Sequence, residues 1–150
     1  MLSVIARLCV HVHVHAMRCG ERVLRCRPGG IQQQFKVARP MVEQLLSTVG
    51  KSLELEGEFK GKVLDDSDAV AAWTNGTVEA VLFPTGDTLN MIEKRAENKE
   101  LVLLINPQWR TGQVISDFGL FGRRRKEEFV ATFKTVYSVT SKRAAGRTIW

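Results

Sequence analysis

Histidine and cysteine are absent from residues 41–150 of this 150-residue chain. A general base built on imidazole, a thiol nucleophile and a zinc site are therefore excluded from that part. An enzyme there would have to use carboxylates, lysine, arginine, tyrosine or hydroxyl groups. All three cysteines and all three histidines lie before residue 41, at Cys9, Cys19, Cys26, His11, His13 and His15. Three cysteines do not pair evenly, so we expect them to be reduced or removed.

Long apolar runs are also missing. The densest is LVLLI at residues 101–105, which is the size of a strand and far below the roughly 18 residues that suggest a membrane span. An apolar fraction of 44% is typical of a globular chain and not of a disordered one. Length and composition together predict one domain with an N-terminal appendage.

Acidic residues are scarce in the first 40 positions, where Glu21 is the only one among seven lysines and arginines. Residues 41–150 are neutral, so the whole formal charge of +6 lies in the first 40 residues. That segment also passes through RPGG at 27–30 and QQQ at 32–34, which are breaker and polar-tract signals. An arginine-rich, acid-poor start is typical of an organelle transit peptide, although Ser3 is its only serine. We therefore expect residues 1–40 to be a transit-peptide-like or disordered leader.

Residues 9–15, CVHVHVH, place a cysteine and three histidines at every second position. In a strand these four side chains would share one face, and thiolate and imidazole are good ligands for zinc or copper. Four ligands in a row on one strand do not easily surround a tetrahedral ion, and no acidic residue is close enough in the sequence to orient them. The leader is the favoured interpretation, and we expect no metal site and no cofactor.

The body of the chain alternates helical and strand patterns. Helices are expected at 41–55 (opened by Pro40), 67–73, within 85–99 (capped near Asp87) and 123–133; strands are expected at 62–66, 78–84, 101–106 and 134–141. Because the inner strands are continuously apolar, the pattern predicts an α/β fold in three layers. It would have a mostly parallel sheet of about four strands with helices on both faces. The domain would span 41–141, and residues 142–150 would form a tail.

Two groups of residues are candidates for binding. The long loop after the 101–106 strand carries aromatic and arginine side chains of the kind that interfaces favour, so it is the first candidate for a protein-binding surface. Its members are Asn106, Trp109, Arg110, Phe118 and Phe121. The alternative is that these residues belong to the core or to turns.

The run RRRK at 123–126 is the second candidate, because Arg123, Arg124 and Arg125 could contact an anion such as RNA. The alternative is a solvated helix face with Arg123–Glu127 and Arg124–Glu128 pairs. The polar residues at strand ends, which include Asp65, Asp66 and Asp87, could bind a nucleotide or phosphometabolite beyond the sheet. Helix capping is the simpler role for Asp66 and Asp87.

Three segments carry a family resemblance. LVLLINPQW (101–109), ISDFG (115–119) and EEFVATFKTVYSV (127–139) follow each other as buried strand, Asn-Pro, loop, helix with F-x-x-x-F and T-V-Y strand. This order resembles the plastid and cyanobacterial DUF1995 family, a domain of unknown function. The family includes low-photosystem-II-accumulation proteins and an appendage of a plastid adenylate kinase. The resemblance covers roughly residues 41–140.

The resemblance implies a non-catalytic plastid protein that assists assembly of photosystem II or other thylakoid proteins. It implies protein partners, among them thylakoid or photosystem subunits, and it supplies no catalytic residues. Two departures are visible: the family has a further strand upstream, where this chain has its expected leader, and further strands after T-V-Y. A truncated domain is therefore expected. The competing hypotheses are a nucleotide or phosphometabolite binder and an RNA-binding accessory protein.

Overall fold

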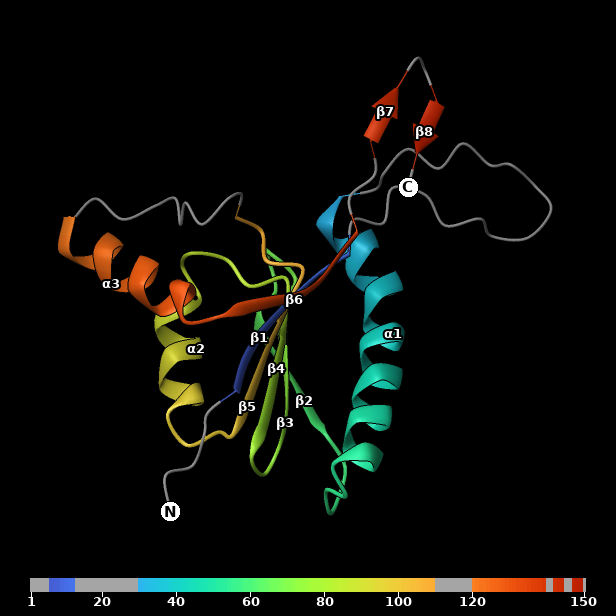
Figure 1. Ribbon diagram of the computed structural model, residues 1–150, viewed down its shortest axis with the longest axis vertical. Helices are drawn as coiled ribbons and strands as arrows, with labels where there is room; N and C mark the ends of the chain where they lie inside the picture. Colours follow the sequence, from blue (N-terminus) through green and yellow to red (C-terminus); the bar gives the residue numbers. More distant parts are fainter. Residues whose placement is uncertain (1–5, 13–29, 110–119, 140–141, 145–146, 150) are drawn as a thin grey trace.

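The computed structural model describes residues 6–12, 30–109, 120–139, 142–144 and 147–149 (Figure 1). The strands are β1 (Ala6–Val12), β2 (Lys60–Asp65), β3 (Val70–Asn75), β4 (Val78–Leu82), β5 (Leu101–Ile105), β6 (Lys134–Val139), β7 (Lys142–Ala144) and β8 (Arg147–Ile149). The helices are α1 (Ile31–Ser52), α2 (Leu89–Ala96) and α3 (Leu120–Ala131). None of the helices within these ranges is long and apolar enough to cross a membrane.

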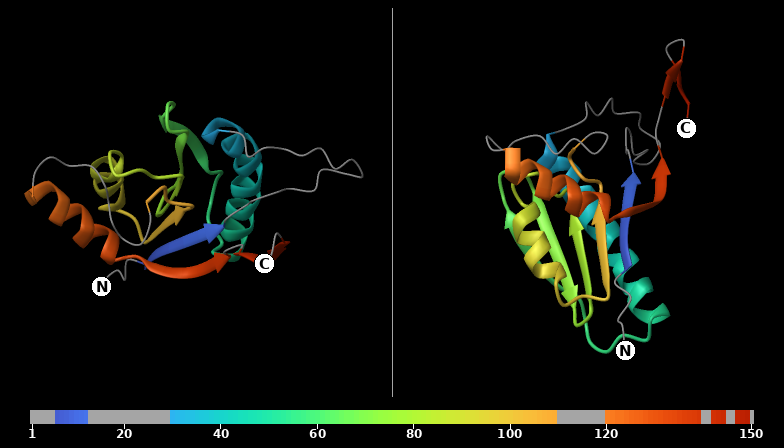
Figure 2. Two further views of the ribbon diagram at one scale, coloured as in Figure 1. Left: turned by 90° about the horizontal axis from the view of Figure 1, so that it is seen from above. Right: turned by 60° about the vertical axis from the view of Figure 1, so that its left-hand side comes forward.

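Six strands form one sheet in the order β2-β3-β4-β5-β1-β6, and β7 pairs with β8 as a separate hairpin within the expected tail. Strands β4, β5, β1 and β6 run parallel, whereas β2–β3 and β3–β4 are antiparallel. Helix α1 covers one face, and α2 and α3 cover the other (Figures 1 and 2). The predicted α/β class with helices on both faces is confirmed, but the sheet is larger than predicted and mixed.

Two apolar clusters hold the three layers together. On the α1 side, Val42 and Leu46 pack against Trp73, Leu82 and other buried residues of the sheet. On the opposite side, Ile92 of α2 and further buried residues pack against alternate positions of the same strands. Each central strand thus buries both faces, which is why the strands read as continuous apolar runs in the sequence.

Two local predictions are wrong. Residues 67–73 were expected to be a helix, because their alanines favour one. The segment instead makes a turn and enters β3, whose first four residues are buried between β2 and β4. The Asp65 carboxylate accepts hydrogen bonds from the Ser67 hydroxyl and from the amides of Ser67 and Asp68, and these bonds hold the pKa of Asp65 below its usual range.

The second error concerns Pro40, which was expected to open a helix. Helix α1 begins nine residues earlier at Ile31, and Pro40 lies inside it. Proline removes one amide donor and usually costs a helix interior about 3 kcal/mol. Pro40 is exposed, so water can reach the backbone carbonyl that it leaves without a donor. The packing of Phe35, Val42 and Leu46 on the sheet then holds the helix together on both sides of it.

Strand β1 lies in the segment that was expected to be a leader. It sits between β5 and β6, with Leu8 opposite Leu103 on one side and Lys134 on the other. The Arg7 guanidinium lies over the Phe129 and Phe133 rings, 5.1 and 5.9 Å from their centroids. It also donates a hydrogen bond to the Thr132 hydroxyl over 2.8 Å. The F-x-x-x-F pair, Phe129 in α3 and Phe133 just after it, is therefore tied to β1, and the further strand expected of the family is present.

Candidate functional site

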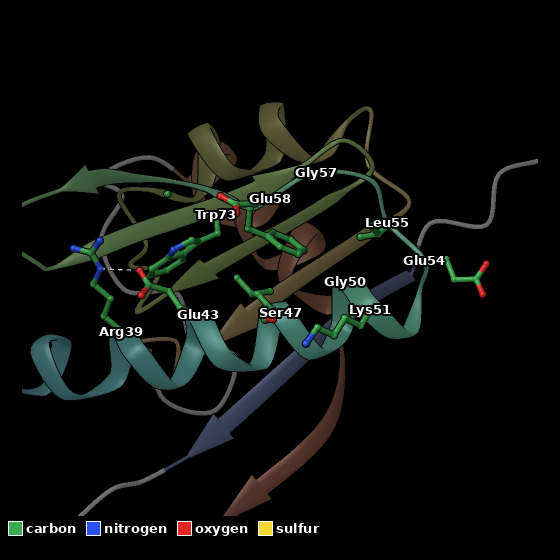
Figure 3. A pocket seen from close by; sticks show the side chains of 13 residues that line it. Arg39, Glu43, Ser47, Gly50, Lys51, Glu54, Leu55, Gly57, Glu58 and Trp73 are labelled. Carbon is green, nitrogen blue, oxygen red and sulfur yellow. Dashed lines mark hydrogen bonds and ion pairs between the residues drawn. The ribbon is translucent and has the colours of Figure 1, made fainter.

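A groove of about 600 Å³ lies between α1 and the edge of the sheet formed by β2 and β3 (Figure 3). Helix α1 forms one wall and β2 the other, and the loop between them closes one end. The lining residues are Arg39, Glu43, Leu46, Ser47, Gly50, Lys51, Glu54, Leu55, Gly57, Glu58, Phe59, Gly61 and Trp73. We call this feature the α1–β2 groove.

Two glycines give the groove its aromatic floor. A Cβ atom on Gly61 of β2 would lie 2.9 Å from the Trp73 Nε1 atom, and one on Gly50 of α1 would lie 3.3 Å from Phe59 Cε2. Glycine is disfavoured by roughly 0.5–1 kcal/mol inside helices and strands, so neither position is chosen by local propensity. In both places the missing side chain lets backbone approach an aromatic ring.

The rim of the groove is charged and mixed in sign. Arg39 and Glu43 form an ion pair on α1, with 2.9 Å between Nε and Oε1. Lys51, Glu54 and Glu58 are exposed around the closed end, and in Figure 3 the Glu54 carboxylate points away from Trp73. An apolar floor with a polar, solvated rim is the usual anatomy of a small protein interface.

The closed end is built by the C-terminus of α1. The Leu55 amide donates to the Gly50 carbonyl over 2.9 Å, and the Glu54 amide donates to the Lys51 carbonyl over 3.3 Å. This is the Schellman pattern, in which the residue after the cap is left-handed and usually glycine. Here that residue is Glu54 with φ +52°, which is a strained conformation for a side chain with a Cβ.

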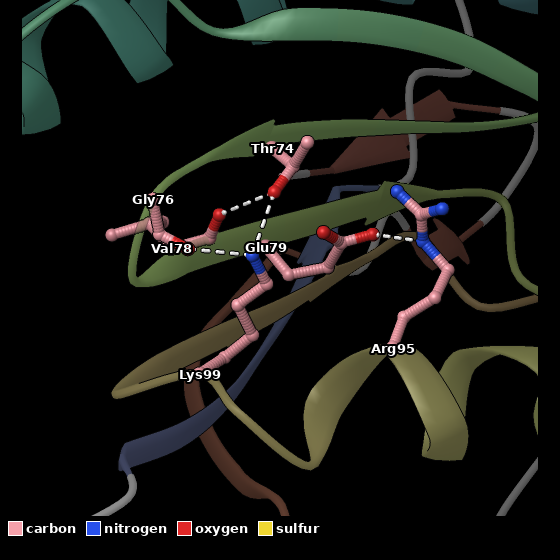
Figure 4. Close-up of polar contacts among 6 residues, drawn as sticks. All are labelled: Thr74, Gly76, Val78, Glu79, Arg95 and Lys99. Atoms are coloured by element: carbon pink, nitrogen blue, oxygen red, sulfur yellow. Dashed lines mark hydrogen bonds and ion pairs between the residues drawn. The ribbon is translucent and has the colours of Figure 1, made fainter.

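A second polar cluster lies on the opposite face of the sheet (Figure 4). Glu79 of β4 is 1% exposed, its Oε1 atom is paired with Arg95 of α2, and its Oε2 atom has no hydrogen-bond partner. The Lys99 ammonium donates to the Thr74 hydroxyl over 2.9 Å and to the Gly76 carbonyl over 2.6 Å. These contacts join α2 and the segment after it to the β3–β4 hairpin, so we assign the cluster a structural role.

Comparison with known proteins identifies the family. The sequence model of the DUF1995 family, which is described as a domain of unknown function, matches residues 6–149 of this chain. The chain belongs to the DUF1995 family. No curated protein and no solved structure matches it. The match begins at the first residue of β1, in agreement with the place of β1 inside the sheet.

Two residues of the predicted interaction loop lie fully within the described part of the chain. Trp109 is partly buried and packs against the core cluster on the α2 side. Asn106 is half-buried with φ +49°, and its amide donates to the Val10 carbonyl over 2.7 Å. Arg110 and Phe118 lie outside the described residues, as does the side chain of Phe121. The two described members thus hold the end of β5 in place.

The basic run of α3 forms ion pairs. Arg123 contacts Glu127 over 2.8 Å and Arg124 contacts Glu128 over 3.0 Å, as predicted. Arg125 reaches across to Glu93 of α2 over 3.1 Å. Each of the three arginines that were candidates for an anion contact therefore already has a carboxylate partner.

The first member of the CVHVHVH motif is a core residue. Cys9 is 6% exposed and belongs to the cluster under α2 and α3. Burial raises the pKa of its thiol from 9.0 to about 11, so the protonated form prevails at neutral pH. Among the described residues, no three or more His, Cys, Asp or Glu side chains are grouped to hold a metal ion.

The raised pKa of Cys9 makes a prediction about alkaline stability. The unfolded thiol loses its proton near pH 9 and the folded one near pH 11. The folded state therefore binds more protons in that range, and the free energy of unfolding falls as the pH rises through it. The loss should total about 2–3 kcal/mol. About 2 kcal/mol of this loss should fall between about pH 8 and about pH 10.5, and urea unfolding at these two pH values measures it in a Cys19→Ser/Cys26→Ser background.

The matched control is the same chain with Cys9→Ala. Its stability should depend less on pH between the two conditions, because every other titrating group is retained. An equal pH dependence with and without the Cys9 thiol would contradict the prediction.

The α1–β2 groove was not foreseen from the sequence. Its walls come from α1 and β2, and the sequence does not reveal that α1 crosses the sheet to reach that edge. The signal that was available is the placement of Gly50 and Gly61 inside regular elements, beside Phe59 and within reach of Trp73. A glycine inside a helix or strand often marks a close approach of backbone.

Proposed function

We propose that this chain is a non-catalytic plastid protein that binds protein partners and assists assembly of photosystem II or other thylakoid proteins. The observation that carries the proposal is the α1–β2 groove, with its aromatic floor and mixed-charge rim. Family membership supports the assembly role only through the resemblance to low-photosystem-II-accumulation proteins. The resemblance to a plastid and cyanobacterial family supports the plastid location.

The shape of the groove favours a protein segment over a compact metabolite. Its lining follows α1 from Arg39 to Lys51, which is about 18 Å at 1.5 Å per residue. Trp73 lines the groove and is 4% exposed, so a bound segment would contact a small part of its surface. Tryptophan pockets ringed by polar contacts are frequent centres of binding energy at protein interfaces.

Ser47→Met should weaken partner binding, because Ser47 is exposed on the groove side of α1 and methionine would fill the space above the floor. Methionine is a good helix former, so the fold should tolerate the change. The tagged full-length chain is expressed in plastids and cross-linked, and recovered photosystem and thylakoid proteins are quantified by mass spectrometry. We expect their recovery to drop by about tenfold, as for a hot-spot loss above 1.4 kcal/mol.

Gln44→Met is the matched control. Gln44 is exposed on the same helix but does not line the groove, so this variant should recover the same partners as the unmodified chain. Equal recovery by Ser47→Met and Gln44→Met would contradict a role for the groove. Recovery of partners unrelated to thylakoids, lost in Ser47→Met alone, would keep the groove and overturn the assembly role.

A further inference from the structure

Strand β2 is an edge of the six-stranded sheet and borders the α1–β2 groove. Its first four residues, 60–63, are exposed, and no described strand pairs with its outer side. The outer backbone amides and carbonyls are thus open to a further strand, which is the mode by which many domains bind extended peptides. The irregular register between Val63 and Asp65 sets one limit to regular pairing.

The two faces of β2 have different chemistry. Gly61 lies opposite Trp73 and Val63 lies opposite Ala71, and both partners belong to the cluster beneath α1. Directly paired residues point to the same face, so Gly61 and Val63 point to the face that α1 covers. Gly61 lines the groove, and Val63 beside it is 49% exposed. On this face, a neighbouring strand would meet the Val63 side chain and the Trp73 ring that lies against Gly61.

The opposite face of β2 is basic. Lys60 lies opposite Thr74 and Lys62 opposite Ala72, which belongs to the cluster beneath α2. Both lysines are exposed, and neither forms an ion pair with a described carboxylate. Two lysines two residues apart would flank one side of any strand that pairs with this edge.

The lysines on one face of β2 and the apolar surface on the other determine which kind of strand can pair with its outer edge. A second copy that paired through its own β2 would place four lysines on one face, about 4.8 Å apart across the strands, and like charges so placed repel. An acidic strand would be attracted instead. We infer that β2 and the α1–β2 groove take an extended partner segment in which apolar and acidic residues alternate, apolar side chains toward Trp73 and acidic ones toward Lys60 and Lys62.

This inference rests on the proposed function, since it names the segment that the groove binds. The probe is a fluorescent seven-residue peptide that alternates valine or phenylalanine with glutamate. A second peptide has lysine in place of glutamate, and anisotropy is measured with the full-length chain. The glutamate peptide should bind about tenfold more tightly, because two favourable charge pairs replace two repulsive ones. A Lys60→Glu/Lys62→Glu variant should reverse the preference.

Backbone pairing is tested separately with N-methylated peptides. Successive amides of a strand point to opposite edges, so methylation at the glutamates and methylation at the apolar positions block opposite edges. One methylated peptide should lose binding and the other should keep it. Equal effects of both, or no reversal in the charge-swapped variant, would overturn the inference.

The outcomes keep the two proposals apart. If the glutamate and lysine peptides bind equally tightly and Ser47→Met blocks both, the groove binds peptides but the alternating acidic strand is wrong. If no peptide binds, the strand inference is overturned, and the plastid cross-linking experiment still decides the proposed function by its own readout.

Discussion

A chain that lacks residues 1–12 is expected to lose its cooperative fold, whereas a chain that lacks only residues 1–5 is expected to keep it. Strand β6 pairs with β1 and with no other strand in the described parts of the chain. Without β1, the sheet would end at β5, and α3 and β6 would lose the contacts of Arg7 with Phe129 and Phe133. The burial of Cys9 and Leu8 would be lost as well.

The expected loss is comparable to the whole stability of a domain of this size, which is roughly 5–15 kcal/mol. Far-UV circular dichroism and urea unfolding followed by tryptophan fluorescence measure it. An unchanged unfolding midpoint in the shorter chain would show that β1 is dispensable. Removal of a plastid leader stays a prediction, and the structure adds a condition to it: a mature chain that keeps this fold begins no later than Ala6.

Arg95→Met is expected to have the second-largest effect, destabilising the fold by about 3–5 kcal/mol. The Glu79 carboxylate is buried, and Arg95 is its only ion-pair partner among the described residues. Removing the guanidinium leaves a buried charge without compensation. The double variant Glu79→Met/Arg95→Met should recover most of the loss, because apolar groups of similar volume then replace both charges.

Arg125→Met is the control for this experiment. Its partner Glu93 is on the same helix as Arg95, but the Arg125 side chain is 70% exposed, so solvent screens the pair. Such pairs contribute about 0–1 kcal/mol. Urea unfolding measures the free energy of unfolding of the unmodified chain, the two single variants and the double variant. Equal costs for Arg95→Met and Arg125→Met, or no recovery in the double variant, would show that burial of Glu79 is not decisive.

Local patterns predicted much of the fold correctly. The continuous apolar run at 101–105 is the buried strand β5, and the predicted alternation of strands and helices from β4 to β6 is confirmed; the β7–β8 hairpin was not predicted. The pairs Arg123–Glu127 and Arg124–Glu128 form because four residues bring side chains together on a helix, whatever the rest of the fold does. These features depend on neighbours in the sequence.

Features that depend on distant neighbours were missed. The excess of arginine and the scarcity of acidic residues in the first 40 positions made residues 6–12 resemble part of a leader. Their place as a strand depends on β5 and β6, which lie far along the chain. The alanines of β3 favour a helix locally, and burial between two other strands overrides that preference. The α1–β2 groove exists only through the crossing of α1 over the sheet, so its residues carry no shared pattern in the sequence.

The position of β1 also sets the order in which the chain can fold during synthesis. The ribosome releases β1 first, but its two neighbours, β5 and β6, are made about a hundred and more residues later. At roughly 5–20 residues per second, β1 waits several seconds or longer for the strands that flank it. During that time, Leu8 and Cys9 stay without their native contacts, so a chaperone that shields this short segment would favour correct assembly of the sheet.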